Sequence, residues 1–563
     1  MPAPRAAALP AAGGMAVGQV QFGYAGTMPD AVYLNGKLWT MDPRQSEAEA
    51  LAVRGGRLLA VGSNAAVLAA AEPGARRLDL RGHTVVPGFH DAHLHLLALG
   101  RARLTLNLRG CRSLAELCAK LRQFAATLPA GAWVEGVGWE PGGWPERRLP
   151  DRRDLDAAAG PHPVYLERAD LHAAVANSAA LHAAGITRET PHPPGGEIVR
   201  DGAGDASGLL LEDARARVRD QIPAPPPGER RRALALALHE AAAHGITSVQ
   251  DYSGWESFLD LERLQAEGAL PVRVRAWLDF RLPLSTLQAQ RAHHAPGDAW
   301  LATGMLKAFL DGSLGSRTAA LYAPYSDAGG TAGRLQYEPA ELQAMARERA
   351  AAGFQLGFHA IGDRAAGQAL DVFEAVAEAL PEAPRPRLEH LQVIAAADLP
   401  RLRRLNVIAS VQPSHWLDDC RWAEARLGAG RLAAAYPWAT LLQMGLLVAF
   451  GSDAPVTDLQ PGLGLFAAVA RPGPDREAPA LGPGETISLA KALYAYTMGG
   501  ALAEGTGPDK GSLSAGKLAD FVVLTHDPRS LAPSDLTRLR VGLTVAGGRV
   551  RHAAPEWHEE VEG

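Results

Sequence analysis

Short apolar stretches alternate with longer helical stretches through the middle of the chain. From about residue 245 onward an apolar stretch recurs roughly every 20–40 residues, and Ala- and Leu-rich helical patterns such as 336–353 and 364–380 lie between. Repeated strand–helix units of this length indicate a parallel sheet, and eight of them indicate closure into a barrel. We therefore predict an α/β fold, a (β/α)8 TIM-type barrel. The predicted strands are residues 84–90, 245–251, 272–278, 305–311, 354–360, 387–391, 407–413 and 446–452.

Both ends of the chain show a different pattern. Residues 29–84 and 505–555 contain short strand-like runs broken by Gly-containing turns, and neither end can close a core alone. We predict one composite β-sandwich from both ends, beside a barrel spanning 85–504. The gap after the first barrel strand is too long for one crossover, so about 103–230 is predicted to be a cap insertion. Residues 1–28 lack the uninterrupted apolar run of a signal peptide and are predicted to be a disordered leader.

Charge and composition exclude several kinds of partner. The 563-residue chain has a formal net charge of -5 and no basic stripe, so we expect no nucleic-acid partner. No stretch reaches the ~18 apolar residues of a membrane span, and we expect no membrane. Cys111, Cys118 and Cys420 form no disulfide framework, which favours a reducing cytoplasm. A small-molecule substrate is expected, and a homodimer is one option for the assembly.

His93 and His95 stand two residues apart in the segment PGFHDAHLHL, just after a predicted strand. In an extended chain, residues i and i+2 point the same way, so both imidazoles can bind one ion. The chain has 18 histidines, which makes chance pairs common. Taken alone, the pair fits a polar turn as well as a metal site.

Three further polar residues end predicted barrel strands. His359 ends the fifth strand, His390 the sixth and Asp453 the eighth. A β/α barrel places its chemistry at this carboxyl end of the strands. A core histidine is the usual alternative for either His, but five ligand-type residues on one barrel edge favour a metal centre. Imidazole and carboxylate ligands suit zinc, with iron, manganese or nickel as alternatives.

Lys307 lies inside the fourth predicted strand, in a chain with only six lysines among its 56 basic residues. A lysine among apolar neighbours costs free energy unless it is paired or neutralised. Two interpretations remain open. The side chain either reaches water at the barrel rim, or it becomes carbamylated and bridges two metal ions.

The chain resembles the amidohydrolase superfamily, and within it the N-substituted formamide deformylase-like branch. The matching segments run in order from about residue 30 to 550: PGFHDAHLHL, KAFLDGSLGSRTA, HAIGD, RLEHLQ, VQPSH, GSDAPV, ALYAYTMGGA and GSLSAGKLADFVVL. The resemblance implies a β/α barrel with a sandwich made from both termini. It also implies the metal-centre positions, which are His93, His95, Lys307, His359, His390 and Asp453.

The resemblance is weaker over the predicted cap and pocket. In RADLHAAVANSAAL, Leu171 stands where the family commonly has Gly, and in GVGWEP, Glu140 stands for Asp. We take four residues as candidates for substrate binding, although a rim ion pair is the alternative for the arginine and a plain loop position for the last histidine. These candidates are Trp139, His172, Arg317 and His415.

The predicted reaction is attack of metal-activated water on the carbonyl carbon of a non-peptide C–N bond. Asp453 is predicted to accept the proton and return it to the leaving nitrogen, while His390 or His415 stabilises the oxyanion. A carbamylated Lys307 would give two ions, and an unmodified one a single ion. Deaminases of this superfamily usually carry a Glu close after the histidine of the fifth strand. No Glu closely follows His359, so deamination is disfavoured. Lactone or ester hydrolysis at the same site stays open, as does a non-catalytic scaffold.

Overall fold

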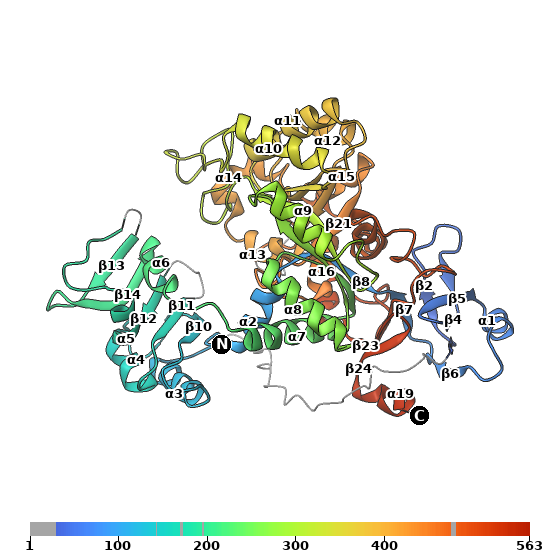
Figure 1. The fold of residues 1–563 in the computed structure, drawn as a ribbon, viewed down its shortest axis with the longest axis horizontal. Helices are drawn as coiled ribbons and strands as arrows, with labels where there is room; N and C mark the ends of the chain where they lie inside the picture. The colour runs from blue at the N-terminus through green and yellow to red at the C-terminus, as the bar shows by residue number, and fades with distance from the viewer. Residues whose placement is uncertain (1–29, 142–143, 169–172, 194–195, 475–479, 563) are drawn as a thin grey trace, which may run out of the picture.

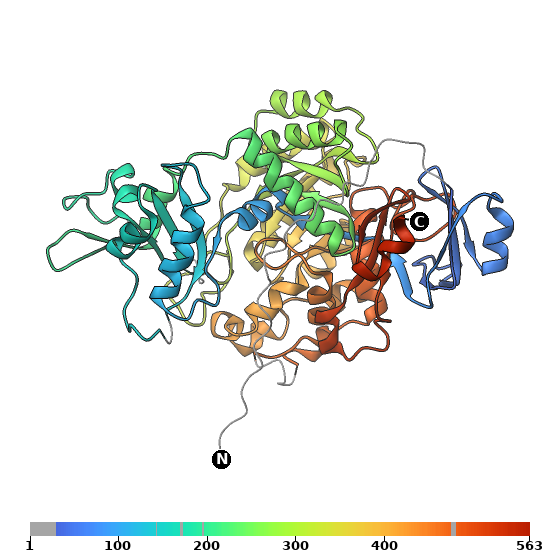
Figure 2. The same ribbon diagram turned by 90° about the horizontal axis from the view of Figure 1, so that it is seen from below.

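A computed structural model describes residues 30–562 apart from 142–143, 169–172, 194–195 and 475–479. Three bodies follow one another across the molecule, with the barrel in the middle (Figure 1). Figure 2 shows the same arrangement from below, with the insertion and the N-terminal sheet on opposite sides of the barrel. Within the part of the chain that the structure describes, no helix is both long and apolar enough to span a bilayer.

An eight-stranded parallel barrel forms the centre, which confirms the predicted fold class. The sheet runs in the order β21-β20-β19-β18-β17-β16-β15-β8. Main-chain bonds from Asp453 N to His93 O (2.7 Å) and from His95 N to Ala454 O (2.9 Å) join its two edges. The strands are β8 (Phe89–Leu94), β15 (Ile246–Asp251), β16 (Arg273–Asp279), β17 (Leu301–Phe309), β18 (Leu356–Ala360), β19 (Arg387–His390), β20 (Ile408–Val411) and β21 (Val448–Phe450).

The first predicted strand was wrong in its boundaries, whereas the other seven each overlap an observed barrel strand. Residues 84–90 divide at Gly88 into β7 (Thr84–Pro87), which belongs to the sandwich, and β8, which belongs to the barrel. A Cβ on Gly88 would meet Oγ1 of Thr247 at 2.1 Å, so only glycine fits this close crossing between the two sheets. His93 therefore lies within a barrel strand rather than beyond one.

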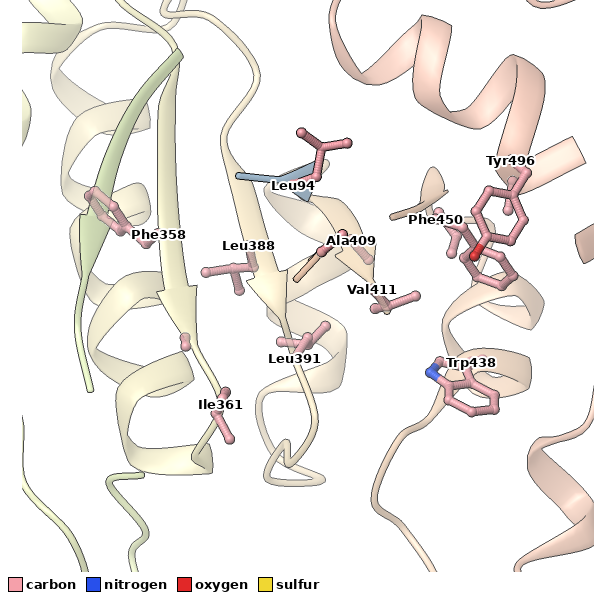
Figure 3. Close-up of a cluster of buried hydrophobic side chains, with 14 of the residues drawn as sticks. Leu94, Phe358, Ile361, Leu388, Leu391, Ala409, Val411, Trp438, Phe450 and Tyr496 are labelled. Atoms are coloured by element: carbon pink, nitrogen blue, oxygen red, sulfur yellow. The ribbon is translucent and has the colours of Figure 1, made fainter. Parts of the chain in front are cut away.

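Helices cover the outside of the barrel. Phe358, Leu388 and Ala409 pair in register on β18, β19 and β20 and belong to the core between strands and helices (Figure 3). The ring of Phe358 stacks on Phe373, with centroids 5.1 Å apart. The helices are α2 (Leu96–Leu104), α7 (Pro227–Ala243), α8 (Trp255–Ala266), α9 (Leu284–His293), α10 (Pro339–Ala351), α11 (Asp363–Ala379), α12 (Leu399–Arg404), α13 (Trp416–Asp419), α14 (Ala423–Leu432), α15 (Trp438–Gln443), α16 (Pro461–Ala470), α17 (Leu489–Tyr494) and α18 (Gly500–Ala503).

Two sheets beside the barrel share one apolar core that draws on both ends of the chain. The first sheet has the order β5-β4-β1-β6 and the second β24-β23-β22-β7-β2-β3. Tyr33 from the N-terminal part meets Phe521 from the C-terminal part edge-on, with centroids 4.9 Å apart. The elements are β1 (Ala31–Leu34), β2 (Lys37–Trp39), β3 (Glu47–Ala48), β4 (Ala50–Arg54), β5 (Arg57–Gly62), α1 (Asn64–Ala70), β6 (Arg76–Asp79), β22 (Phe521–Leu524), β23 (Val541–Ala546), β24 (Arg549–Ala553) and α19 (His558–Glu562).

The insertion after β8 has a six-stranded sheet and an apolar core of its own. It leaves the barrel after α2 and returns through α7, and these two helices pack together. The predicted leader lies outside the described residues. The elements of the insertion are β9 (Leu106–Asn107), α3 (Leu114–Ala125), β10 (Val134–Trp139), α4 (Arg152–Ala159), β11 (Val164–Arg168), β12 (Ala173–Ala176), α5 (Ser178–Ala183), β13 (Gly196–Arg200), β14 (Ala206–Glu212) and α6 (Ala216–Arg219).

Candidate metal centre

Potential ligand atoms of His93, His390 and Asp453 all lie within 4.8 Å of one another. The three side chains are buried and come from the carboxyl ends of β8 and β19 and from the residue that follows β21 by three positions. Residues separated by hundreds of positions in the sequence therefore meet at one end of the barrel. Two imidazoles and a carboxylate at this spacing match the donor set of a zinc site.

His93 and His95 are both anchored through Nδ1. Nδ1 of His93 lies 2.7 Å from Oε2 of Glu389, and Nδ1 of His95 lies 2.9 Å from the main-chain oxygen of Tyr252. An imidazole that donates Nδ1–H carries its lone pair on Nε2. The two Nε2 atoms lie 3.5 and 3.1 Å from Oδ1 of Asp453. Both rings therefore offer a lone pair on the side of the aspartate.

His359 and His390 face each other with ring centroids 4.4 Å apart. His359 Nε2 lies 3.0 Å from the carbonyl oxygen of Gly312, so its proton is satisfied there. Among the described residues, the buried Nδ1 atoms of both rings have no hydrogen-bond partner. Buried polar atoms in proteins are nearly always satisfied. A cation held by these nitrogens would satisfy them, and the donor set therefore fits a divalent ion.

Two residues of this cluster have unusual backbone geometry. His390 has φ of 74° and Asp453 has φ of 57°, both in the left-handed region that side chains rarely adopt. Such a conformation costs about 1–3 kcal/mol and persists only where the surrounding structure imposes it. His390 is the last residue of β19, and Asp453 follows β21 by three positions.

The electrostatic environment favours neutral His93 and His390 beside an ionised Asp453. Burial, with the Lys307 ammonium nearby, lowers the pKa of His93 to about 4, and burial lowers the pKa of His390 well below its usual range. Although burial opposes ionisation of Asp453, the surrounding histidines hold its pKa well below the usual range. Metal ligands must be deprotonated, so the lowered pKa of His93 and His390 favours cation binding by these two rings. His95 differs, because Asp453 raises its pKa against the cost of burial.

Lys307 is fully buried, so the interpretation in which it reaches water at the barrel rim is wrong. Its Nζ lies 3.3 Å from His93 Nε2 and about 5 Å from two ring centroids, 5.0 Å for Phe309 and 5.3 Å for Trp277. Burial lowers the pKa of Lys307 to about 8, against the carboxylates of Glu389 and Asp453, which raise it. The amine therefore points into the cluster of ligands.

The four pocket candidates have different surroundings. His415 lies beside the cluster, with Nε2 3.5 Å from Oδ2 of Asp453. Arg317 is bound to Asp327 (2.9 Å) and is partly exposed, which matches the expectation of a rim ion pair.

Trp139 is fully buried in the core of the insertion and donates its indole N–H to Leu166 O (2.9 Å), so it has no free surface for a substrate. His172 lies outside the described residues.

Arg387 and Glu389 are parts of this site that the sequence reasoning missed. Both are completely buried on β19, and Glu389 contacts His93 directly. The signal was present in the segment RLEHL, where two charged residues alternate with leucine in a predicted strand of a parallel sheet. Strands of parallel sheets are commonly buried on both faces. Only a specific partner stabilises a charge at such a position.

A closed parallel barrel with these ligands at its carboxyl end is the architecture of a metal-dependent hydrolase. The sequence matches the model of the amidohydrolase family over residues 76–552. The chain therefore belongs to the amidohydrolase family and is a metal-dependent hydrolase.

Similar proteins cover nearly the whole chain. It is 35% identical to Protein LONG AFTER FAR-RED 3 of Arabidopsis thaliana, with 93% of this chain and 92% of that protein covered. It is 31% identical to an N-substituted formamide deformylase of Arthrobacter pascens, with 93% and 98% covered. A solved structure of an uncharacterized metal-dependent hydrolase from Pyrococcus horikoshii OT3 is similar at a TM-score of 0.77 and 28% identity, over 90% of this chain and 99% of that one. The likeness thus extends beyond the barrel to both ends.

Proposed function

We propose that this protein hydrolyses a non-peptide C–N bond of amide, formamide or carbamoyl type in a small molecule, with one or two divalent ions, zinc foremost. The observation that carries the proposal is the approach of His93, His390 and Asp453 to within 4.8 Å at the barrel end. The relative named as an N-substituted formamide deformylase supports the bond type. When bound, a divalent ion lowers the pKa of water toward ~7 and polarises a carbonyl oxygen.

Asp453 is proposed to move the proton. Its carboxylate lies among the candidate ligands, where it could accept a proton from the attacking water and return it to the leaving nitrogen. His95 Nε2 lies 3.1 Å from one carboxylate oxygen and His415 Nε2 3.5 Å from the other. Both rings therefore lie beside the carboxylate. His390 or His415 is the proposed partner of the oxyanion.

Carbamylation of Lys307 is proposed to determine whether the centre binds one ion or two. The neutral amine can add to the carbon of carbon dioxide, which forms an N–C bond, releases one proton and leaves a carbamate. The two carbamate oxygens could then bridge two ions. Burial and a 3.3 Å approach of Nζ to His93 Nε2 support this, because a modified chain would place its oxygens among the same ligands.

The test combines metal analysis with a substrate screen. Purified protein is analysed for bound transition metals and assayed against N-formyl, N-acyl and carbamoyl compounds, with lactones, esters and amino-heterocycles as the contrast set. Bound metal and hydrolysis confined to C–N substrates is the expected result. Protein without metal or turnover would support a scaffold, and turnover of lactones or ring amines alone would overturn the proposed bond type.

A further inference from the structure

A salt-bridged pair of charged residues lies inside the barrel, directly behind the metal centre. Arg387 and Glu389 occupy alternate positions of β19, and both have 0% exposed surface. Nε of Arg387 donates to Oε1 of Glu389, and the other carboxylate oxygen of Glu389 lies 2.7 Å from Nδ1 of His93. One carboxylate therefore joins a buried guanidinium to a candidate metal ligand.

The guanidinium of Arg387 donates hydrogen bonds to three neighbouring strands as well as to Glu389. Arg387 also donates to Gln250 Oε1, to the main-chain oxygen of Ala92 and to Ser410 Oγ, the last at 2.8 Å. These acceptors lie on β15, β8 and β20, so the arginine ties three strands to its own. Its Cζ lies 4.9 Å from the ring centroid of Trp277, a contact in the range of a cation–π interaction. The pair is thus fixed in position by the barrel itself.

Trp277 also packs against the metal centre. Its ring centroid lies 4.9 Å from that of His93, and Lys307 Nζ lies 5.3 Å from the same indole. The indole therefore limits movement of His93 from one side while Glu389 binds it from another. Gln412 Nε2 is the other polar atom near His93 Nδ1, but at 3.4 Å it is farther than the carboxylate.

We propose that Glu389, held by Arg387, is a positioning residue that sets the metal affinity of the centre. The carboxylate accepts the Nδ1–H of His93, which fixes the imidazole as the tautomer with its lone pair on Nε2. It also fixes the ring so that Nε2 faces Asp453 and Lys307. A negative charge on the far side of the ring makes Nε2 a stronger donor to a cation. Neither residue touches substrate in this role.

Arg387 has a distinct part in this arrangement. Its Nε donates to Oε1 of Glu389, while Oε2 lies 2.7 Å from Nδ1 of His93. The guanidinium therefore holds the carboxylate in the position from which it orients and polarises His93.

The test measures zinc affinity rather than turnover, because the inference rests on the metal centre proposed above. Zinc dissociation constants of wild type and Glu389→Gln are measured by competition with a chelator. Removing such a carboxylate partner typically costs about 10- to 100-fold in metal affinity, and that loss is the expected result. If the wild type binds no zinc, the metal centre itself fails. If Glu389→Gln binds zinc within about twofold of wild type, only the positioning role of Glu389 is overturned.

A second variant guards against misfolding. Glu389→Gln alone leaves Arg387 as a buried unpaired charge, whereas Arg387→Met with Glu389→Gln removes both charges together. The double variant is expected to fold and still bind zinc about 10- to 100-fold more weakly. Wild-type zinc affinity in a folded double variant would contradict the proposal.

The chain offers a matched control at the other end of the barrel. Arg273 and Asp520 form another buried pair (2.7 Å), with the Arg273 Cζ 4.3 Å from the ring centroid of Trp300. Arg273→Met with Asp520→Asn makes the same chemical change away from the metal centre. Its zinc affinity is expected to stay within about twofold of wild type, whatever its melting temperature. An equal loss of affinity in this control would show that the effect is general destabilisation and would overturn the proposal.

Discussion

The two ends of the barrel both bury charged side chains, but they satisfy them differently. At the end facing the sandwich, the Asp520 carboxylate accepts hydrogen bonds from Nε and Nη2 of Arg273 (2.7 and 2.8 Å). It also accepts one from the main-chain N–H of Gly547 (2.7 Å). At the carboxyl end, buried nitrogens of His359 and His390 have no hydrogen-bond partner among the described residues. The Arg273–Asp520 pair is satisfied within the protein, whereas the two imidazole nitrogens are open to a ligand.

This difference separates a structural cluster from a functional one. Proteins satisfy most of their buried polar groups, and two open imidazole nitrogens beside a buried carboxylate are typical of a metal site. The unusual backbone angles agree, since His390 and Asp453 have positive φ values and Arg273 and Asp520 do not. Changes at the carboxyl end should therefore affect function, and changes at the end facing the sandwich should affect stability.

Asp453→Asn should give the largest effect. The amide keeps the shape of the side chain but cannot accept a proton, so kcat is expected to fall by about 10⁴-fold, or ~5 kcal/mol. Metal content and the melting temperature should stay close to wild type. The measurement is steady-state kinetics on the metal-loaded proteins. Turnover near the wild-type rate would remove Asp453 from proton transfer.

Asp520→Asn should give the opposite result. It leaves the guanidinium of Arg273 buried without a charged partner, which is expected to cost about 3–5 kcal/mol of unfolding free energy. Activity per folded molecule should not change. Urea denaturation measures the stability, and kinetics below the unfolding transition measure the activity. A loss of kcat without a loss of stability would mean that the two ends are not separate in function.

Lys307→Ala should have an intermediate effect on the metal centre. If a carbamate on this lysine bridges two ions, bound metal is expected to fall below the wild-type content and kcat to fall by about 10- to 100-fold, with partial rescue by short-chain carboxylic acids. Elemental analysis with and without added acid checks this. Unchanged metal stoichiometry would favour a single ion held by the histidines.

The pH dependence of stability should give the smallest effect. Arg273 lowers the pKa of Asp520 against the cost of burial, so the folded pKa lies below the unfolded one. The stabilisation is then fully present above about pH 4, the unfolded value, and is lost as pH falls through the folded pKa. The difference in unfolding free energy between wild type and Asp520→Asn should therefore shrink below about pH 4. A constant difference down to pH 3 would contradict this assignment.

The order of strands and helices could be predicted because each barrel strand is apolar and is separated from the next by a helical pattern. The boundary at Gly88 could not, because the segment TVVPGFH is continuously apolar while its two halves pair with different sheets. Strand periodicity reports burial, and both halves are buried. In the structure the boundary falls at Gly88, where the backbone approaches Thr247 closely.

The candidate ligands could be predicted because polar residues at the ends of apolar strands are conspicuous. The surroundings of Trp139 could not, because an indole in an insertion packs into a core or a pocket with the same local pattern. The position of Glu389 relative to the metal centre could not be predicted either, for a related reason. A carboxylate next to a predicted ligand can point toward the metal or behind it, and its place behind His93 depends on the register of β19 with its neighbours.

The most direct test of a metal centre at the carboxyl end is the metal content of purified protein, measured by elemental analysis. We predict one or two divalent ions per chain in the wild type. We predict close to none in a folded variant that combines His93→Ala with His390→Ala. A wild type without bound metal, or a double variant that keeps its full complement, would contradict the assignment of this cluster as the metal centre.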